Sequence, residues 1–584
     1  MFLNDWITEL QTSLFRDLLA FAPELVLCGG IVMLLFLRLF SRLNRLHLGL
    51  FALGIALMAL ALSGWQWYSL ETNLDTRMRV RPLSAAEDLF AGMLVQDKLT
   101  VYMRIFLFGF TSLVIWLTLL TGIPDREDSG DFYSLLLGAT VGMSLMASAN
   151  HLLMIFIGVE MASLPSYALA GFLKGRRQSS EAALKYVVYG GGASGIMLYG
   201  ISLLSGKFGT GYLPDVAKGF AEVLWQAPSG AGLDALLVLG TLFVLVGVGF
   251  KLAAFPFHFW CPDVFEGAAA EVAAFLSVAS KGAALALAGR FVLVLGGLAG
   301  RAPDYDTWFK MAPYLGMPLA TFAALTATFG NLAAYLQTNL KRLLAYSTIA
   351  HAGYMLMGVA AMTPDGVGAV LFYLIPYLFM NLGAFAIVAF LRNQTGSEDL
   401  SSFAGLVQRS PLLVITLGFF LLSLLGIPPL AGFAAKFQIF RVLYDAGKLY
   451  TAKEEYLHSP LLAYTMYALL FIGGLNTVFS LVYYVKVLKV MILDRAPGEL
   501  EGQEQAPIPL PQGPAVYASL LAAVVFLLGI FWDPLARTAA AGVDRFHAVS
   551  IARPVHRTSP RLTAQPEQEG DNQDQAEAPQ RGQR

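Results

Sequence analysis

The chain has 584 residues, of which 57% are hydrophobic and 14% charged, and its formal net charge is -1. A soluble domain carries roughly 25% charged residues, so this composition excludes a water-soluble surface of matching size. The lack of basic excess argues against a nucleic-acid partner. The two cysteines, Cys28 and Cys261, occur in no Cys/His pattern with metal-ligand spacing, which argues against zinc, iron–sulfur and disulfide frameworks.

Apolar runs recur along the chain with about the 20-residue length that a helix needs to cross hydrocarbon. Their backbone groups must be paired within the segment in lipid, so these runs are expected to be helices. The sequence therefore predicts an all-α protein of about fourteen transmembrane helices embedded in the lipid bilayer, with both ends on one side. The predicted spans are 21–41, 46–68, 99–122, 131–149, 151–173, 181–205, 232–259, 271–299, 312–336, 342–362, 366–391, 411–440, 463–491 and 514–534.

Basic clusters follow the first, fifth, ninth and thirteenth predicted spans, all of which end on one face of the membrane. An excess of lysine and arginine marks cytoplasmic loops, so this face is expected to be cytoplasmic and both termini to lie opposite. The clusters are Arg38, Arg42 and Arg45; Lys174, Arg176 and Arg177; Lys341 and Arg342; and Lys486, Lys489 and Arg495.

Seven of the ionisable side chains within the predicted spans form the candidate site. Such groups are costly in a membrane and are functional by default, so this set predicts a proton pathway. Each candidate also has a structural alternative. Glu160 could pair with a lysine to hold two helices together, Lys185 could extend its ammonium to the membrane interface, and the histidines could be hydrogen-bonded core residues. The candidates are Glu160, Lys185, Lys251, Lys281 and Lys436, with His351 and His258 as relays.

Two geometric expectations follow from this set. A carboxylate and a lysine at similar depth should approach each other, so the side-chain tips of Glu160 and Lys251 are expected roughly 3–8 Å apart. Lys281 is expected between Lys251 and Lys436, connected to Lys436 through water or His351.

Two predicted spans carry helix breakers at membrane depth. Pro256 follows Lys251 in the seventh span, and Pro428, Pro429 and Gly432 precede Lys436 in the twelfth. A proline removes a backbone hydrogen bond, so both helices should be interrupted, near residues 255–256 and 426–432. Broken helices at corresponding places in two halves indicate a transport site.

The corresponding halves predict two inverted five-helix repeats and set the domain organisation. The ranges are 1–130 for spans one to three, 131–300 for the first antiporter-like repeat (spans four to eight), 312–491 for the second inverted repeat (spans nine to thirteen), 492–552 for a linker and span fourteen, and 553–584 for a disordered polar tail.

One long motif, FKLAAFPFHFWCPDVFEGAAAEVAAFLSVASKGAAL, resembles the signature of the subunit N family of bacterial respiratory complex I (NADH–quinone oxidoreductase), the counterpart of mitochondrial and plastid subunit 2. The segments EAALKYVVYGGGASGIMLYG, LKRLLAYSTIAHAGYMLMG and GIPPLAGFAAKF are also similar, and the likeness runs from about residue 21 to residue 490. The resemblance assigns the family's proton-carrying positions to Glu160, Lys185, Lys251, Lys281 and Lys436.

The resemblance implies a proton-translocating subunit of a multi-subunit enzyme in the bacterial inner membrane. NADH, flavin, iron–sulfur clusters and quinone are expected in partner subunits, with no cofactor or metal in this chain. The expected neighbours are the antiporter-like subunit M and the small subunits K, J and A. One departure concerns Glu271, because the family usually has Pro-Thr-Pro where this chain has Ala269-Ala270-Glu271.

The closest alternative is a subunit of a multi-subunit sodium/proton antiporter, which shares the fold and the lysines. The PDVFEGA stretch favours subunit N over that alternative. A substrate permease would need a polar cavity for a solute, and a membrane scaffold would not need four lysines at membrane depth.

Overall fold

The computed structural model describes residues 13–39, 47–72, 87–125, 128–226, 234–295, 305–451, 459–495 and 507–547. All belong to one compact unit, Met1–Ala548. The predicted polar tail, 553–584, and most of the linker after Ile492 lie outside these residues.

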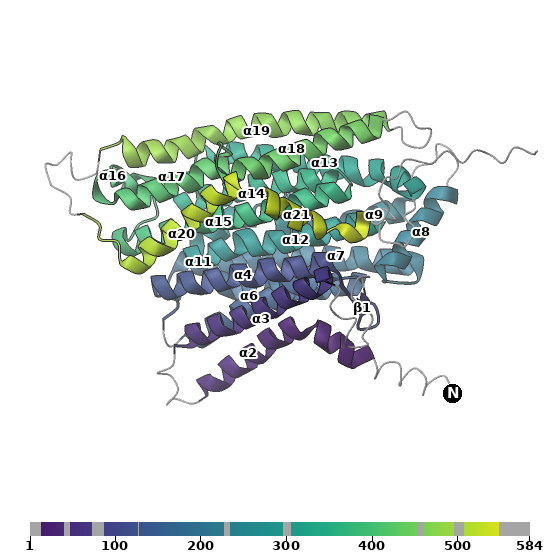
Figure 1. The fold of residues 1–584 in the computed structure, drawn as a ribbon, viewed down its shortest axis with the longest axis horizontal. Coiled ribbons are helices and arrows are strands. Elements are labelled where there is room, and N and C mark those ends of the chain that lie inside the picture. Colours follow the sequence, from purple (N-terminus) through teal and green to yellow (C-terminus); the bar gives the residue numbers. More distant parts are fainter. Residues whose placement is uncertain are drawn as a thin grey trace, which may run out of the picture. The chain divides into compact units, whose positions relative to one another are not determined.

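The described residues form helices and one short hairpin (Figure 1). The helices are α2 (Ala22–Arg38), α3 (Leu48–Thr72), α4 (Lys98–Thr121), α5 (Ser129–Ser148), α6 (Leu152–Ala170), α7 (Arg177–Phe208), α8 (Leu213–Gln226), α9 (Ala235–Leu252), α10 (Trp260–Gly267), α11 (Ala270–Phe275), α12 (Lys281–Leu295), α13 (Tyr305–Ala334), α14 (Leu340–Ala360), α15 (Pro364–Thr395), α16 (Leu406–Arg409), α17 (Pro411–Leu425), α18 (Ala431–Thr451), α19 (Pro460–Ile492), α20 (Gln512–Ile530), α21 (Asp533–Ala541) and α22 (Asp544–His547).

Among the described residues, eleven helices are long and apolar enough to cross a membrane, and twelve if the bent pair Ser13–Ala20 and Ala22–Arg38 is one span. The protein is therefore an all-helical, multi-pass membrane protein, as predicted. Helices occur at all fourteen predicted places. However, α5 and the two halves of the twelfth predicted span do not meet the length and hydropathy criteria individually.

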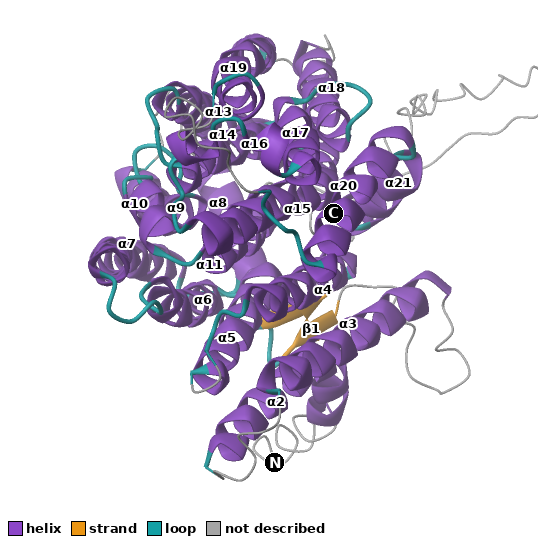
Figure 2. Cartoon of the chain, turned by 90° about the vertical axis from the view of Figure 1, so that its left-hand side faces the viewer, coloured by secondary structure: helices purple, strands orange, loops and turns teal. Residues whose placement is uncertain are grey.

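The long helices run roughly alongside one another, and Figure 2 shows many of them nearly end-on. The most buried helices are Ala270–Leu295, whose apolar segment is entirely buried, and α14, whose apolar segment is 94% buried. The hairpin pairs β1 (Glu87–Leu89) with β2 (Leu94–Gln96) in antiparallel register. Charged groups on the central helices are therefore shielded from lipid by the helices around them.

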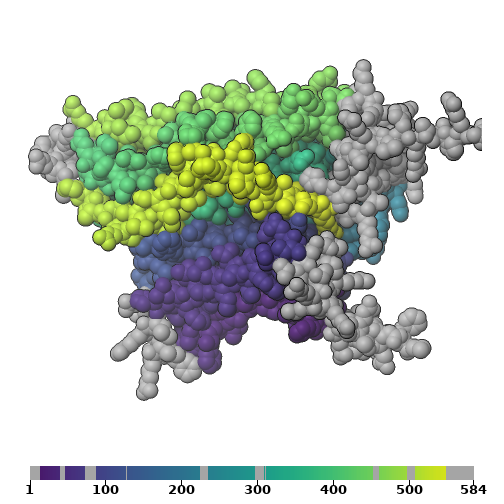
Figure 3. Space-filling view, in the orientation of Figure 1, coloured from purple at the N-terminus to yellow at the C-terminus, as the bar shows by residue number. Residues whose placement is uncertain are grey.

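The C-terminal helices lie across other parts of the chain. In Figure 3, α20 and α21 (yellow) cross the surface between the purple N-terminal helices and the green helices of the second half. Tyr517 of α20 donates a 2.9 Å hydrogen bond to the Leu113 carbonyl of α4. Lys98 at the start of α4 binds Asp544 of α22 at 2.8 Å. This packing connects the end of the described chain to its first spans.

Helix α8, like the shorter helices α10, α16 and α22, has no counterpart among the predicted spans. Helix α8 follows α7 and buries Leu213, Val216, Ala217 and Phe220. These positions follow the i, i+3, i+4, i+7 spacing of an amphipathic helix. The spacing could have predicted α8, although its 14 residues are too few for a span.

Both predicted interruptions are present. Helix α9 ends at Leu252, followed by Ala253 in the left-handed region (φ 53°), and α10 begins at Trp260. Helix α17 ends at Leu425, followed by Gly426 (φ 93°), and α18 begins at Ala431. Each break exposes the end of a half-helix inside the bundle, where backbone groups need new partners.

The second break requires a glycine. The Gly432 N–H is bound by the Ser423 hydroxyl at 3.0 Å, and a Cβ at position 432 would lie 1.7 Å from the Ser423 carbonyl oxygen. We expect Gly432→Ala to destabilise the protein by about 1–3 kcal/mol, the usual cost of overpacking. Thermal unfolding of the purified protein measures this. The control is Gly474→Ala, where no atom lies within 4 Å of the added carbon, and equal stability of the two variants would contradict the prediction.

Candidate functional site

Lys251 lies at the end of α9, immediately before the first break. Its side chain is fully buried, and its ammonium nitrogen has no hydrogen-bond partner among the described residues. Glu160 on α6 interacts with it electrostatically, although the two form no contact within the 4.0 Å of a salt bridge. The Glu160 carboxylate instead accepts a hydrogen bond from the Ser194 hydroxyl of α7. The predicted separation of roughly 3–8 Å stays a prediction.

Lys281 lies directly after a π-helical turn, Leu276–Ser280, which joins α11 to α12. It is fully buried, and its ammonium has no hydrogen-bond partner among the described groups; the same holds for the neighbouring Ser280 hydroxyl. Turns of this kind are rare and occur frequently at functional sites. The structure thus places an ionisable group with free hydrogen-bonding capacity in the most buried helix.

His258 lies between the two half-helices of the first break. Its ring packs against Phe259 and Phe329, each with a centroid distance of 4.4 Å, and it interacts electrostatically with Lys281. Its Nδ1 has no hydrogen-bond partner among the described side chains. This environment is compatible both with a relay and with the alternative of a core histidine.

Lys436 follows the second break, in α18. Its ammonium donates a 2.9 Å hydrogen bond to the carbonyl of Leu425, the last residue of α17, and lies 4.6 Å from the ring centre of Tyr354. The C-terminus of a helix is the negative end of its dipole, so the break itself supplies the partner of this lysine. Lys251 precedes its break, whereas Lys436 follows its break.

His351 on α14 connects the two halves of the candidate site. It is buried, and it interacts electrostatically with both Lys281 and Lys436. Its Nδ1 lies 2.7 Å from the Tyr373 hydroxyl, and its Nε2 lies 3.3 Å from the Tyr484 hydroxyl. Hydroxyl and imidazole groups both donate and accept hydrogen bonds. His351 and its two tyrosine partners therefore form a buried set of groups that can each donate and accept a hydrogen bond.

Lys185 differs from the other candidate lysines because it is paired. Its ammonium lies 2.6 Å from Asp263 of α10 and 2.8 Å from Glu181, and 37% of its side chain is exposed. Asp263 also binds Arg342 of α14 at 2.7 Å. One of its partners, Glu181, lies on the same helix, and the other, Asp263, comes from a helix distant in sequence. The predicted role of Lys185 in proton transfer stays a prediction.

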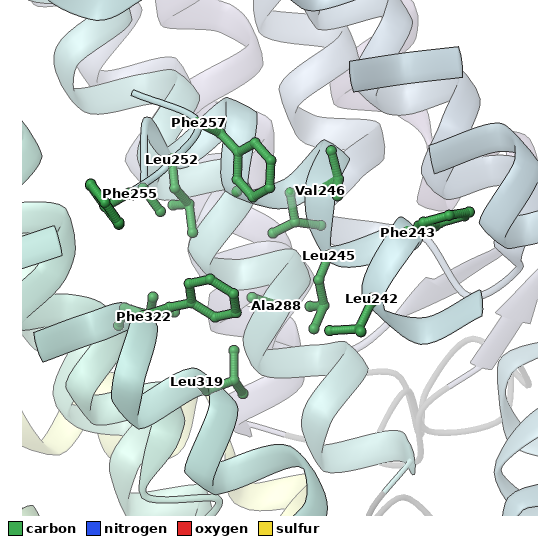
Figure 4. A pocket seen from close by; sticks show the side chains of 14 residues that line it. Leu242, Phe243, Leu245, Val246, Leu252, Phe255, Phe257, Ala288, Leu319 and Phe322 are labelled. Carbon is green, nitrogen blue, oxygen red and sulfur yellow. The ribbon is translucent and has the colours of Figure 1, made fainter. Parts of the chain in front are cut away.

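An apolar cavity of about 220 Å³ borders the first break. Figure 4 shows side chains that converge on it from α9 (Leu252), from α13 (Phe322) and from the break after α9 (Phe257). Among the described residues that line it, none is charged. This cavity therefore does not form the charged pathway but lies beside it.

The sequence analysis overlooked several buried ionic groups that lie within predicted spans. Arg104 of α4 binds Glu24 of α2 at 2.6 Å, and both side chains are almost fully buried. Arg290 of α12 binds Asp97, the N-cap of α4, through two hydrogen bonds of 2.6 and 2.9 Å. The rule that ionisable residues in spans are unusual identifies Glu24, Arg104 and Arg290 as well. Each of these three side chains is paired with an opposite charge on another part of the chain, which indicates a role in holding helices together.

Metal binding has no support in the residues that the structure describes, where no group of three or more His, Cys, Asp or Glu side chains could hold an ion.

Comparison with protein families matches residues 149–453 to the family described as NADH:quinone oxidoreductase/Mrp antiporter, TM. NADH-quinone oxidoreductase subunit N of Anaeromyxobacter sp. (strain Fw109-5) is 37% identical over 91% of this chain and 97% of its own length. The subunit N of Bacillus anthracis is 35% identical over 89% of this chain and 94% of its own.

Chains in two solved structures superpose on this chain over most of its length. A chain in respiratory complex I from Thermus thermophilus with bound aureothin superposes with a TM-score of 0.66 at 28% identity, covering 89% of this chain and 100% of that one. A chain of the Mrp complex from Dietzia sp. DQ12-45-1b superposes with a TM-score of 0.71 at 20% identity, covering 91% of this chain and 98% of that one. This likeness shows a shared fold. From these matches and the residues of its site, the chain belongs to the NADH-quinone oxidoreductase subunit N family.

Proposed function

We propose that this chain is the proton-translocating membrane subunit of a bacterial NADH:quinone oxidoreductase and that it moves protons through Glu160, Lys251, Lys281, His351 and Lys436. The observation that carries the proposal is that the buried His351 interacts electrostatically with both Lys281 and Lys436. Electron transfer takes place in other subunits, so the work of this chain is to load and release protons in response.

The antiporter alternative has weaker support. The chain of the Mrp complex is 20% identical, and such a likeness carries the fold alone, because one fold hosts many functions. The relatives named subunit N are 35–38% identical over most of the chain. We therefore favour the respiratory complex over a separate sodium/proton antiporter.

The partners follow from the same proposal. The chain contacts other membrane subunits of the complex, with subunit M and the small subunits K, J and A as its neighbours. Flavin, iron–sulfur clusters and quinone bind to partner subunits, and this chain itself binds none. Exposed apolar side chains on α2 and α3, such as Phe36 and Trp65, face lipid or these neighbours.

The topology is proposed as fourteen spans, with residues 131–300 and 312–491 as inverted repeats and both ends opposite the cytoplasm. The left-handed residues that end α9 and α17, Ala253 and Gly426, support the repeat because each half contains one broken helix. The twelfth span would then consist of α17 and α18 together.

Substitution of the central lysine tests the proposal. We expect Lys281→Ala to leave the complex assembled but to lower NADH-driven proton uptake by membrane vesicles at least about tenfold, since a positioned proton-transfer group contributes roughly 10²–10⁴-fold. Uptake is normalised to NADH oxidation with an artificial electron acceptor, which reports assembled enzyme. Lys174→Ala, which removes a lysine with a side chain 75% exposed, is the control. Unchanged uptake in the Lys281 variant would remove it from the pathway.

A further inference from the structure

One buried carboxylate has no role in the pathway described above. Glu271, at the start of the helix that carries Lys281, is fully buried, and neither of its carboxylate oxygens has a hydrogen-bond partner among the described groups. A buried carboxylate without donors is costly in its charged form. Such a group either recruits water or binds a proton, and both are properties of a proton-carrying residue.

The surroundings of Glu271 hold two cations without binding it tightly. The Arg392 guanidinium of α15 lies 3.7 Å away, beyond hydrogen-bond distance. Lys341 of α14 interacts electrostatically with Glu271, but its ammonium binds Glu398 at 2.9 Å and the Ala268 carbonyl at 2.7 Å. Both cations thus lie near Glu271, while neither of its carboxylate oxygens accepts a hydrogen bond from a described group.

This cluster lies at one end of the bundle, where α14 begins and α15 ends. Exposure increases outward along it, from 0% at the Glu271 side chain, through 6% at Arg392, to 12% at Glu398. The positive-inside rule places this end at the cytoplasm. A proton from the aqueous side therefore meets Glu398 and Lys341 before it reaches Glu271.

Polar groups continue from Glu271 toward Lys281. Ten residues of helix correspond to about 15 Å, which is too far for one transfer. Between them, Ser277 of the π-helical turn accepts a hydrogen bond from the Asn381 amide of α15. The Asn381 carbonyl oxygen and the Ser280 hydroxyl are buried and without partners among the described residues. Buried polar atoms of this kind are normally bound to water, so this turn has the groups to hold a hydrogen-bonded chain.

We propose that Glu271 is an additional proton-carrying residue of this chain, which takes protons at the end of the bundle marked by Lys341 and Arg392 and passes them to Lys281. The inference rests on the proposed function. A proton from water forms an O–H bond with the Glu271 carboxylate. That bond breaks when the proton moves to water held at Ser277 and Asn381, and neutral Lys281 accepts a proton from that chain. The carboxylate is thereby regenerated.

The competing explanation is a structural ion pair with Arg392. Removing one member of a buried pair destabilises a protein, whereas removing both relieves the uncompensated charge. The test therefore compares Glu271→Gln, Arg392→Gln and the double variant in the full complex. Assembly is measured as yield and artificial-acceptor activity, and pumping as NADH-driven proton uptake.

We expect Glu271→Gln to lower proton uptake per assembled complex at least about tenfold. The reason is that a positioned proton-transfer group contributes roughly 10²–10⁴-fold to a rate. Glu271→Asp, which keeps a carboxylate, should retain most of the uptake. The double variant should assemble normally and still pump poorly, and it supplies the measurement even where Glu271→Gln alone fails to assemble. Asp128→Asn is the control, because Asp128 pairs with the exposed Lys174 at 2.7 Å.

Recovery of both assembly and pumping in the double variant would overturn the proposal in favour of a structural pair. Full uptake by Glu271→Gln would also overturn it. Lys281→Ala distinguishes a failure of the Glu271 proposal from a failure of the proposed function. If Lys281→Ala loses uptake while Glu271→Gln does not, only the role of Glu271 fails. If Lys281→Ala pumps normally, the proposed function fails and the inference about Glu271 fails with it.

Discussion

Lys251→Arg is expected to lose nearly as much NADH-driven proton uptake as Lys251→Ala, at least about tenfold each, because a positioned proton-transfer group contributes roughly 10²–10⁴-fold. Arginine keeps the positive charge but cannot release its proton at accessible pH. Lys251 is fully buried and has no hydrogen-bond partner among the described residues, and Glu160 is the charge that acts on it. Its proposed role depends on releasing a proton when that charge moves.

The required energies are modest. A proton moved against ~100 mV needs about 2.3 kcal/mol, and a swing of about two pKa units supplies about 2.7 kcal/mol. A purely structural Lys251 predicts the opposite result, since arginine would keep the electrostatic interaction with Glu160 and restore uptake. The measurement is proton uptake by vesicles per assembled complex. Lys218→Ala, whose side chain is 74% exposed, should behave as wild type.

Asp97→Ala is expected to have the largest effect on stability, about 3–5 kcal/mol, because it leaves the Arg290 guanidinium buried without its partner. Arg290 is fully buried, and the two side chains form a bidentate pair. Asp97 also caps α4 through the Thr100 N–H at 2.8 Å. Thermal unfolding of the solubilised complex measures the loss. An unchanged midpoint would show that this pair does not stabilise the fold.

Two further variants show whether the loss of stability comes from the unpaired buried charge of Arg290. Asp97→Ala combined with Arg290→Met should recover much of the loss, because no buried charge is then left unpaired. Asp215→Ala, which breaks an exposed pair with Lys218, should change stability by less than about 1 kcal/mol.

The same pair sets an expected pH dependence. Burial acts to raise the pKa of Asp97, but the Arg290 guanidinium outweighs it, so the pKa lies below its ordinary value. A lowered pKa means that the carboxylate stabilises the fold above its unfolded-state pKa of about 3.9. This contribution is lost only as the pH falls further, through the folded-state value, so it is present throughout the physiological range.

The proposed pathway combines two kinds of lysine site. Lys251 and Lys281 have free hydrogen-bonding capacity within the described protein, whereas Lys436 is bound to the Leu425 carbonyl at the broken helix. His351 is hydrogen-bonded to Tyr373 and Tyr484 and interacts electrostatically with both Lys281 and Lys436.

The sequence by itself determined the membrane class, the two helix breaks and the buried lysines. Span length and apolarity are properties of a continuous segment. A proline removes a backbone hydrogen bond from a helix, although α6, α13 and α15 continue through Pro165, Pro318 and Pro376. Lys251 and Lys281 are buried as expected, because both lie too deep in their spans for the side chain to extend to the membrane surface. The resemblance of the motif around Pro256 was sufficient to indicate the family that the comparisons later established.

Only the tertiary structure decided which polar groups meet. His351 and Tyr484 are 133 residues apart in the chain, and Lys185 and Asp263 are 78 apart. Their contacts depend on which helices pack together, and a pattern within one helix does not contain that information. The sequence placed Glu271 beside an altered motif, but its free oxygens and its distance from Arg392 arise from the packing of α11 against α15. Local chemistry thus fixed the candidates, and helix packing fixed their partners.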